Sequence, residues 1–226
     1  MSNAIELIKV WKNYANNLPV LKGVSLSVPV GAFISIRGRS GAGKTTLLRL
    51  IGLLDRPSNG EIILLGKETS KISDGEASKI RLKHIGFIFQ SFNLIPSLTV
   101  LENIELPMAL LGVKKEARRK RSIELLERFH MEMLANRFPT ELSGGEQQRV
   151  AILRATVNNP DIILADEPTS NLDEENSRLV YELLSEINRE SLAAIIMTEV
   201  SLEEKLPTSE DYLLKDGILY KHKLNI

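Results

Sequence analysis

One short segment constrains the fold of this chain more than any other. Residues 38–45 read GRSGAGKT and lie between an apolar run, residues 33–37, and a helix-forming run that begins near Lys44. Glycines let the backbone turn so that successive N–H groups face one concavity, and a helix N-terminus adds its positive dipole end. The segment therefore predicts a phosphate-binding loop between a strand and a helix of an α/β fold.

The residue types of this loop indicate the ligand as well as the fold. Lys44 supplies a mobile positive charge for β- and γ-phosphates, and the Thr45 hydroxyl can ligate Mg²⁺. A chance glycine-rich turn is the alternative, and the flanking strand and helix argue against it. The remaining contacts are expected from the rest of the segment and the helix start: Gly38, Arg39, Ser40, Gly41, Ala42, Gly43 and Thr46.

A nucleoside triphosphatase of this kind also needs a carboxylate at the end of a neighbouring buried strand. The run DIILADEP, residues 161–168, offers two adjacent acids after a stretch of apolar residues. We expect Asp166 to hold the metal through its water shell and Glu167 to orient or deprotonate the attacking water. A polar strand end without chemistry is the alternative, and it carries little weight beside the loop at 38–45.

Composition limits the other function classes. Lysine plus arginine (29) equals aspartate plus glutamate (29), so no overall basic field indicates nucleic-acid binding. The absence of cysteine excludes disulfides, thiolate metal sites and cysteine nucleophiles, and it fits a reducing compartment. Glu6 and Lys9 stand where a signal peptide would be apolar, and no apolar run reaches the ~20 residues of a membrane span. If the protein works at a membrane, we expect another chain to span it.

The order of apolar runs predicts the architecture. Early runs are close together and alternate, which is typical of an antiparallel sheet, whereas later runs are uniformly apolar and separated by helical segments. Residues 99–159 read as almost wholly helical, with Pro107 and Pro139 as expected breaks, and an amphipathic helix follows Asp173. The basic run at 114–121 is interpreted as a solvated helix face rather than a lipid or RNA patch.

These patterns predict an α/β P-loop (RecA-like) fold: a parallel-sheet core with an N-terminal antiparallel β lobe and an inserted helical lobe. We expect a single domain over residues 1–226. Residues 1–90 and 159–226 would form the β lobe and the nucleotide-binding core, and residues 91–158 the helical lobe.

The run TELSGGEQQRVAILRA, residues 140–155, resembles the nucleotide-binding subunits of ATP-binding-cassette (ABC) transporters, and the resemblance spans nearly the whole chain. A serine and two glycines that open a helix form a second anion site. The resemblance implies ATP and Mg²⁺ as ligands and a head-to-tail homodimer or heterodimer of ATPase subunits. The run LSGGEQQ, residues 142–148, matches the family's signature motif. In such a dimer the signature motif of one chain would bind the γ-phosphate held by its partner, through Ser143, Gly144, Gly145 and Gln147.

Other family motifs fall in the expected order. Tyr14 matches the aromatic residue that stacks on adenine, and an edge-strand aromatic is the alternative. Gln90 matches the glutamine whose amide reaches Mg²⁺ and the attacking water. The run SNLD, residues 170–173, matches the loop that crosses the dimer interface.

A narrower resemblance concerns the direction of transport. The segments at 52–73 and 86–110 are similar to the subgroup serving lipoprotein release, macrolide and peptide export, and the cell-division ATPase. This implies extrusion or mechanical work driven through a separate membrane-spanning subunit. It also implies a peripheral position on the cytoplasmic face of the cell membrane, reached only through that partner.

The chain departs from the family pattern at one catalytic position. The family's strand after the catalytic glutamate usually ends in Thr-His, and here Thr198 is followed by Glu199. An ionised glutamate only accepts hydrogen bonds and would be repelled by phosphate. We therefore expect Glu199 to turn away from the nucleotide or to bind a proton, with ATP binding kept and turnover low. The histidines of the chain lie outside this motif, at His84, His130 and His222.

Two functions are compatible with the family motifs and with Glu199. The first is an ATPase that dimerises on two ATP molecules and drives a membrane partner. The second is a dimerising switch or regulatory subunit that closes on ATP and hydrolyses it poorly.

Overall fold

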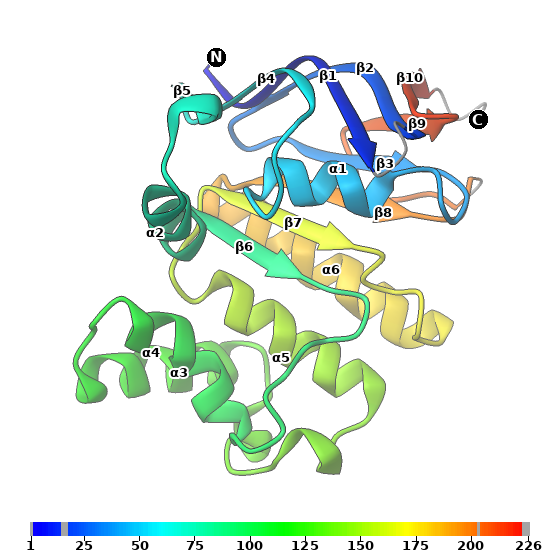
Figure 1. Ribbon diagram of the computed structural model, residues 1–226. Coiled ribbons are helices and arrows are strands. Elements are labelled where there is room, and N and C mark those ends of the chain that lie inside the picture. The colour runs from blue at the N-terminus through cyan, green and yellow to red at the C-terminus, as the bar shows by residue number, and fades with distance from the viewer. Residues whose placement is uncertain (1, 15–17, 203, 223–226) are drawn as a thin grey trace.

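Two β-sheets and a group of helices make up the computed structural model, which describes residues 2–14, 18–202 and 204–222 (Figure 1). The smaller sheet is antiparallel and has the order β2-β1-β4-β5. Burial alternates along much of β1, because one face of this sheet packs against the core. Its strands are β1 (Asn3–Tyr14), β2 (Leu18–Pro29), β4 (Asn59–Leu64) and β5 (Lys67–Glu68).

The larger sheet has the order β10-β9-β3-β8-β7-β6, with parallel pairing from β9 through to β6 and an antiparallel β10 at its edge. Because its central strands are covered on both faces, β3 and β8 are buried along their whole length. The carboxyl ends of β3, β7 and β8 meet at one edge of the sheet, where ligands bind in such folds. The strands are β3 (Phe33–Arg37), β6 (Ile85–Ile88), β7 (Ile162–Asp166), β8 (Ala194–Glu199), β9 (Glu210–Lys215) and β10 (Ile218–His222).

The helices divide between the sheets and a separate helical region. Figure 1 shows α3, α4 and α5 in the lower half, with α5 lying next to the large sheet, where it contacts β6 and α6. These three helices have their own apolar core, which includes Ile104, Leu126 and Leu153. The helices are α1 (Lys44–Ile51), α2 (Asp74–His84), α3 (Val100–Leu110), α4 (Lys115–Arg128), α5 (Gly144–Thr156) and α6 (Glu174–Ser191).

The predicted fold class is confirmed, with two differences in detail. Pro107 was expected to break a helix, yet it lies inside α3, which continues to Leu110. Helix α2 was not predicted, because only Ala77 of its residues is buried and the segment therefore has no apolar stripe. Its start was readable, since Ser73 and Glu76 form a capping box.

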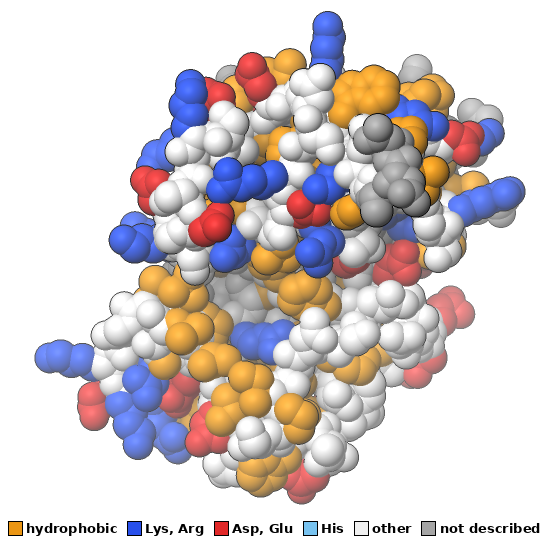
Figure 2. All heavy atoms as spheres, viewed as in Figure 1, with side chains coloured by type: hydrophobic (Ala, Val, Ile, Leu, Met, Phe, Trp, Pro, Cys, Tyr) orange, Lys and Arg blue, Asp and Glu red, His pale blue; other side chains and the backbone are white. Residues whose placement is uncertain are grey.

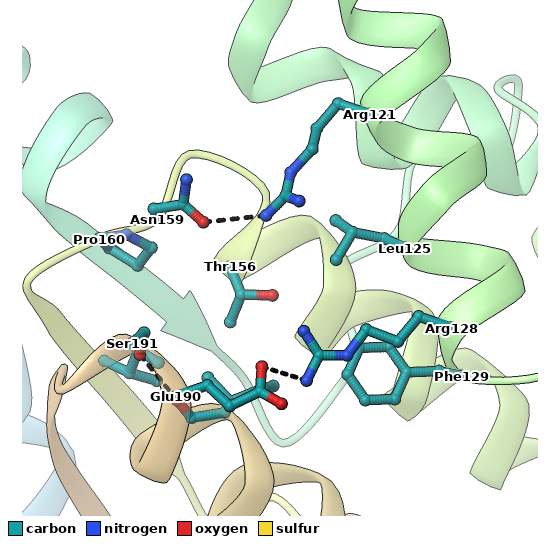
Figure 3. A pocket seen from close by; sticks show the side chains of 11 residues that line it. Arg121, Leu125, Arg128, Phe129, Thr156, Asn159, Pro160, Glu190 and Ser191 are labelled. Atoms are coloured by element: carbon teal, nitrogen blue, oxygen red, sulfur yellow. Dashed lines mark hydrogen bonds and ion pairs between the residues drawn. The ribbon is translucent and has the colours of Figure 1, made fainter.

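Arginines of α4 bind α6 and the segment that precedes β7, around a small cavity of about 150 Å³ (Figure 3). Arg121 donates to Asn159 Oδ1 at 2.9 Å, and Arg128 donates to Glu186 Oε1 at 2.9 Å and pairs with Glu190. Among the described helices, none combines the length and the apolar character needed to cross a membrane.

Candidate functional site

The loop between β3 and α1 has a backbone that glycine makes possible. Gly41 (φ 79°) and Gly43 (φ 104°) adopt left-handed conformations, and Gly43 is the N-cap of α1. A Cβ on Gly38 would lie 2.6 Å from the carbonyl oxygen of Leu214, so a side chain has no room there. By contrast, a Cβ on Gly41 would meet nothing within 4 Å. The loop is thus packed tightly on its inner side and open on its outer side.

Lys44, at the start of α1, is buried and reaches back over the loop. Its Nζ donates to the carbonyl oxygens of Gly38 at 2.6 Å and Arg39 at 3.2 Å. The same atom lies 3.0 Å from Glu167 Oε1. The structure therefore brings the predicted phosphate-binding lysine and the predicted catalytic glutamate into direct contact. Thr45 is exposed and Thr46 is half-buried beside them.

Thr198 of β8 connects the two predicted acids of β7. Its hydroxyl donates to Asp166 Oδ1 at 2.8 Å and accepts from the main-chain N–H of Glu167 at 3.0 Å. Glu167 has a left-handed backbone (φ 47°), which is costly for a residue other than glycine. Such strain persists where surrounding contacts hold the residue. Thr198 binds the main-chain N–H of Glu167 and Lys44 binds its carboxylate, so the residue is held at both ends.

Glu199 faces away from this cluster. Its main-chain carbonyl accepts from the N–H of Gly38 at 3.0 Å, which ties the end of β8 to the phosphate loop. Its carboxylate instead accepts hydrogen bonds from Thr169 Oγ1 at 3.1 Å and from the Tyr181 hydroxyl of α6 at 3.3 Å. Because successive side chains of a strand point to opposite faces, Glu199 and Thr198 face different sides of the sheet.

Glu199 is buried, with only 5% of the residue exposed. Burial raises its pKa to about 7, and the negative charges of Glu204 and, to a smaller extent, Glu167 act in the same direction. Hydrogen bonds from Thr169 and Tyr181 partly oppose the rise. Burial and the nearby Glu199 charge also raise the pKa of the Tyr181 hydroxyl, so it remains a donor. Both alternatives expected for Glu199 are therefore compatible with its surroundings: it is turned aside, and it is partly protonated at neutral pH.

The signature segment starts α5. Ser143 is the N-cap and forms a capping box with Glu146, whose carboxylate accepts from the N–H and the hydroxyl of Ser143, each at 2.8 Å. A Cβ on Gly145 would lie 2.1 Å from Asn176 Oδ1 of α6, so this glycine is required by packing. A Cβ on Gly144 would lie 3.6 Å or more from its neighbours. Gln147 donates to the carbonyl oxygen of Leu142 at 3.2 Å.

The remaining predicted residues are held by neighbours that the sequence did not indicate. The Gln90 carbonyl oxygen accepts from Asn171 Nδ2 at 3.0 Å, which joins it to the SNLD loop. The Tyr14 hydroxyl donates to Asp55 Oδ2 at 3.2 Å, and Lys12 Nζ lies 5.0 Å from the Tyr14 ring centroid. Asn103, fully buried in α3, binds the chain after Gln90 through the main chain of Ile95 and nearby residues.

A cavity of about 650 Å³ lies beside the phosphate loop. Tyr14 is not among the described residues that line it. Figure 1 shows α1 and α5 in different halves of the molecule, and among the described residues none of 143–147 lines the cavity beside the phosphate loop. The cavity is lined by residues 18–20, 22, 39–42, 202 and 213–217.

The residues present fit a Mg²⁺ ion bound with a nucleotide. Mg²⁺ is held by one or two protein oxygen atoms together with phosphate oxygens and water, rather than by a full cage of side chains. Asp166 and Thr45 supply such oxygen atoms at the strand and helix ends. Among the described residues no group of three or more His, Cys, Asp or Glu could hold a metal alone.

A second hollow lies between the sheets and the helical region. Figure 2 shows it between the upper and lower halves of the molecule, with hydrophobic side chains gathered on its walls. This groove has a volume of about 250 Å³ and is bordered by α2, β6, α3 and α5. The rings of Phe87 and Phe89 stack at 5.7 Å within it. Its lining residues are Arg81, Leu82, Ile85, Gly86, Phe87, Phe89, Asn93, Pro107, Arg154, Ala155, Asn158 and Pro160.

A glycine-rich loop, a buried lysine and a carboxylate pair at the edge of a parallel sheet define a P-loop nucleoside triphosphatase. The sequence model of the family described as "ABC transporter" matches residues 21–170. The chain belongs to this family and is an ATP-binding subunit with the ATPase fold.

Relatives and solved structures agree with this assignment. The chain is 41% identical over 213 residues to the lipoprotein-releasing system ATP-binding protein LolD of Blochmanniella floridana, covering 94% of this chain and 91% of the relative. It is 43% identical over 95% of its length to ABC transporter H family member 2 of Dictyostelium discoideum, but it spans only 43% of that protein. The cassette MJ0796 of Methanocaldococcus jannaschii has been solved as a dimer in a post-hydrolysis state with ADP and Pi. That structure matches with a TM-score of 0.87 and 40% identity, covering 98% of this chain and 99% of the other.

Proposed function

We propose that this subunit binds Mg-ATP, pairs head to tail with a second ATPase subunit, and drives export through a separate membrane-spanning partner. The observation that carries the proposal is the pair of phosphate-binding helix starts, at Lys44 and at Ser143–Gly145, in separate halves of one chain. Two copies related by a two-fold axis would each complete the other's site. Dimeric MJ0796, at 40% identity, supports this assembly.

Hydrolysis would use the contacts of the β7 and β8 ends. Bound Mg²⁺, held by Thr45 and Asp166, would supply charge neutralisation for the phosphates. Lys44 would bind the β- and γ-phosphates, and Glu167 would orient or deprotonate the attacking water. The Thr198 hydroxyl, which binds Asp166 and the Glu167 amide, would keep the two acids in register. Gln90 would reach the same water from the start of the helical region.

The membrane partner would insert a short helix into the groove beside Phe87 and Phe89. An apolar groove with stacked aromatic rings suits a helix that presents apolar anchors. The resemblance to the family implies a partner groove just beyond Gln90, near Phe92, Leu94, Ile95 and Leu98, yet none of these four is among the lining residues of this groove. Through this partner the subunit would lie at the cytoplasmic face of the membrane. The similarity to LolD supports the export direction.

A second candidate function follows from Glu199. A carboxylate that binds Thr169 and Tyr181 offers no donor to a γ-phosphate, so the chain would close on ATP and hydrolyse it slowly. Such a chain would act as a switch or as the weak half of a heterodimer. Turnover of Mg-ATP, measured alone and with a candidate partner subunit, separates the two functions.

The test of assembly uses Glu167→Gln with Mg-ATP in size-exclusion chromatography with light scattering. Slower hydrolysis should preserve ATP and favour the closed dimer. Omitting Mg-ATP, or replacing it with Mg-ADP, should return the monomer. A Glu167→Gln chain that remains monomeric at saturating Mg-ATP argues against head-to-tail pairing of identical subunits.

A further inference from the structure

The turn that follows Gln90 has an unusual backbone. Phe92 (φ 59°) and Asn93 (φ 51°) are both left-handed, and neither is glycine. The left-handed conformation is costly for Phe92 and less so for Asn93, because asparagine visits this region more readily than most residues, so the pair needs other contacts to hold it. The turn lies directly beside a residue proposed to act in hydrolysis.

Arg154, in the last turn of α5, supplies those contacts. Its guanidinium donates to the carbonyl oxygens of Phe92 at 2.8 Å and of Asn93 at 2.5 Å. Within the described part of the chain it makes no ion pair with a carboxylate, and burial lowers its pKa. Its hydrogen-bond partners are therefore the two carbonyl groups of the left-handed pair, rather than an acid or the end of its own helix.

The same turn also reaches the opposite end of α5. A Cβ on Gly144 would lie 3.7 Å from Phe92 Cζ, which places the Phe92 ring against the signature segment. Gly144 and Arg154 are separated by about 15 Å along a helix axis. The turn therefore lies along α5, bound at one end through its main chain and at the other through its aromatic ring.

We infer that Arg154 is a positioning residue that clamps the Phe92–Asn93 turn to α5. Through this clamp, Gln90 and the start of α5 keep a fixed spatial relation, so that movement of the signature segment is transmitted to Gln90. The catalytic consequence rests on the proposed role of Gln90, whereas the clamp itself does not. Arg154 and Asn93 also line the groove, so a helix bound there would contact the clamp directly.

The guanidinium chemistry sets the choice of variants. A planar fork can donate to two neighbouring carbonyl groups at once, whereas an ammonium has no such geometry and methionine has no donor. Arg154→Met should therefore release the turn and Arg154→Lys should release it in part. Adding Asn93→Gly to either variant should restore part of the lost turnover, because glycine adopts the left-handed conformation without the Cβ penalty.

The first readout is hydrogen exchange without nucleotide. We expect the amides of residues 92–95 to exchange at least about tenfold faster in Arg154→Met, because local opening becomes easier. Arg128→Met is the matched control, since Arg128 also joins the helical region to the rest of the chain but binds carboxylates of α6 (Figure 3). Exchange at 92–95 should be unchanged in the control.

The second readout is steady-state ATP hydrolysis. We expect kcat to fall about tenfold in Arg154→Met with KM for ATP within about twofold, because a misplaced group near the water affects the chemical step more than binding. Asn93→Gly should recover part of kcat. If Arg154→Met does not fold, Arg154→Lys with and without Asn93→Gly gives the same comparison.

Unchanged exchange at residues 92–95 in the Arg154 variants overturns the clamp. A fall in kcat that Asn93→Gly does not relieve also overturns it, because the loss then has another origin. A Gln90→Ala variant with full turnover would overturn the proposed role of Gln90, and the exchange measurement would still decide whether the clamp exists.

Discussion

Lys44 Nζ lies 3.0 Å from Glu167 Oε1, so the side chain expected to bind phosphate is ion-paired with the one expected to act on water. Lys44 is buried, and two main-chain carbonyl oxygens also accept from it. An incoming triphosphate must therefore share Lys44 with Glu167. The pair links nucleotide binding to the position of the catalytic carboxylate.

Neutralising Glu167 should separate binding from hydrolysis. In Glu167→Gln the negative charge beside Lys44 is absent, so we expect ATP to bind several-fold more tightly, since like charges no longer compete. Loss of the general base should lower single-turnover hydrolysis by about 10²–10⁴-fold. Equilibrium binding of a fluorescent ATP analogue and quenched-flow hydrolysis measure the two effects.

A matched control for this variant is Asp74→Asn, which removes an exposed ion pair with Arg56 far from the phosphate loop. Exposed pairs contribute little, so binding and turnover should be unchanged. Hydrolysis by Glu167→Gln at the natural rate would assign the base to another residue.

The two glycines of the signature segment should respond differently to alanine. A Cβ on Gly145 would meet Asn176 Oδ1 at 2.1 Å, so Gly145→Ala should lower the free energy of unfolding by about 1–3 kcal/mol. Adding Asn176→Ala should recover most of that loss, because the clashing atom is gone. Thermal and urea unfolding of the single and double variants measure both effects.

Gly144→Ala is the companion variant, because its new methyl group would be 3.6 Å or more from neighbouring atoms. It should keep its unfolding free energy and weaken ATP-dependent pairing, since its methyl group would crowd the proposed anion site at the start of α5. Equal stability losses at both positions would mean that the packing around α5 is not as described.

Much of the fold could be predicted because its signals are local. The buried strands are uniformly apolar, as β3 and β8 show, and the glycine loop fixed the strand–helix junction at Lys44. The acids of β7 were predicted for the same reason, since parallel strands end at a common edge. Helix α2 was missed because its contacts are few and its surface is polar.

Contacts between distant segments could not be predicted from one sequence. Thr198 holds Asp166 and Glu167 across two strands, and nothing in the runs around them indicates that hydrogen bond. The direction of the Glu199 side chain depends on Thr169 and Tyr181, which lie on a loop and a helix. Arg154 reads as an ordinary helix residue until its carbonyl partners are known.

Replacing Glu199 with histidine tests whether the missing family histidine slows ATP hydrolysis in this chain. An imidazole is neutral or cationic at neutral pH and can donate to phosphate, unlike the carboxylate. A hydrogen bond to a charged group contributes about 1.5–3 kcal/mol. An imidazole that turns from Thr169 and Tyr181 toward the phosphates should therefore raise single-turnover hydrolysis in Glu199→His by roughly tenfold or more. A sharp fall in the rate would instead mean that Glu199 itself takes part in catalysis.

Glu199 should also make the stability of the protein depend on pH. Burial raises the pKa of this carboxyl group from 4.5 to about 7 in the folded chain. The folded state therefore binds more protons than the unfolded state between these values, and stability from this group falls as pH rises from about 4.5 to 7. Above pH 7 the folded chain holds a buried carboxylate at a cost of about 3 kcal/mol.

Glutamine at position 199 removes the titration while keeping an oxygen that accepts from Thr169 and Tyr181. The stability difference between Glu199→Gln and the natural chain should be near zero at pH 4.5 and grow to about 3 kcal/mol by pH 8. Comparing the two chains at each pH cancels the titration of the acids that both contain.

Glu204→Gln is the second variant, because the Glu204 charge helps to raise the Glu199 pKa and its loss should move the transition to lower pH. A difference that stays constant from pH 4.5 to 8 would show that Glu199 keeps an ordinary pKa in the folded protein, and that its contacts with Thr169 and Tyr181 compensate for burial of its charge.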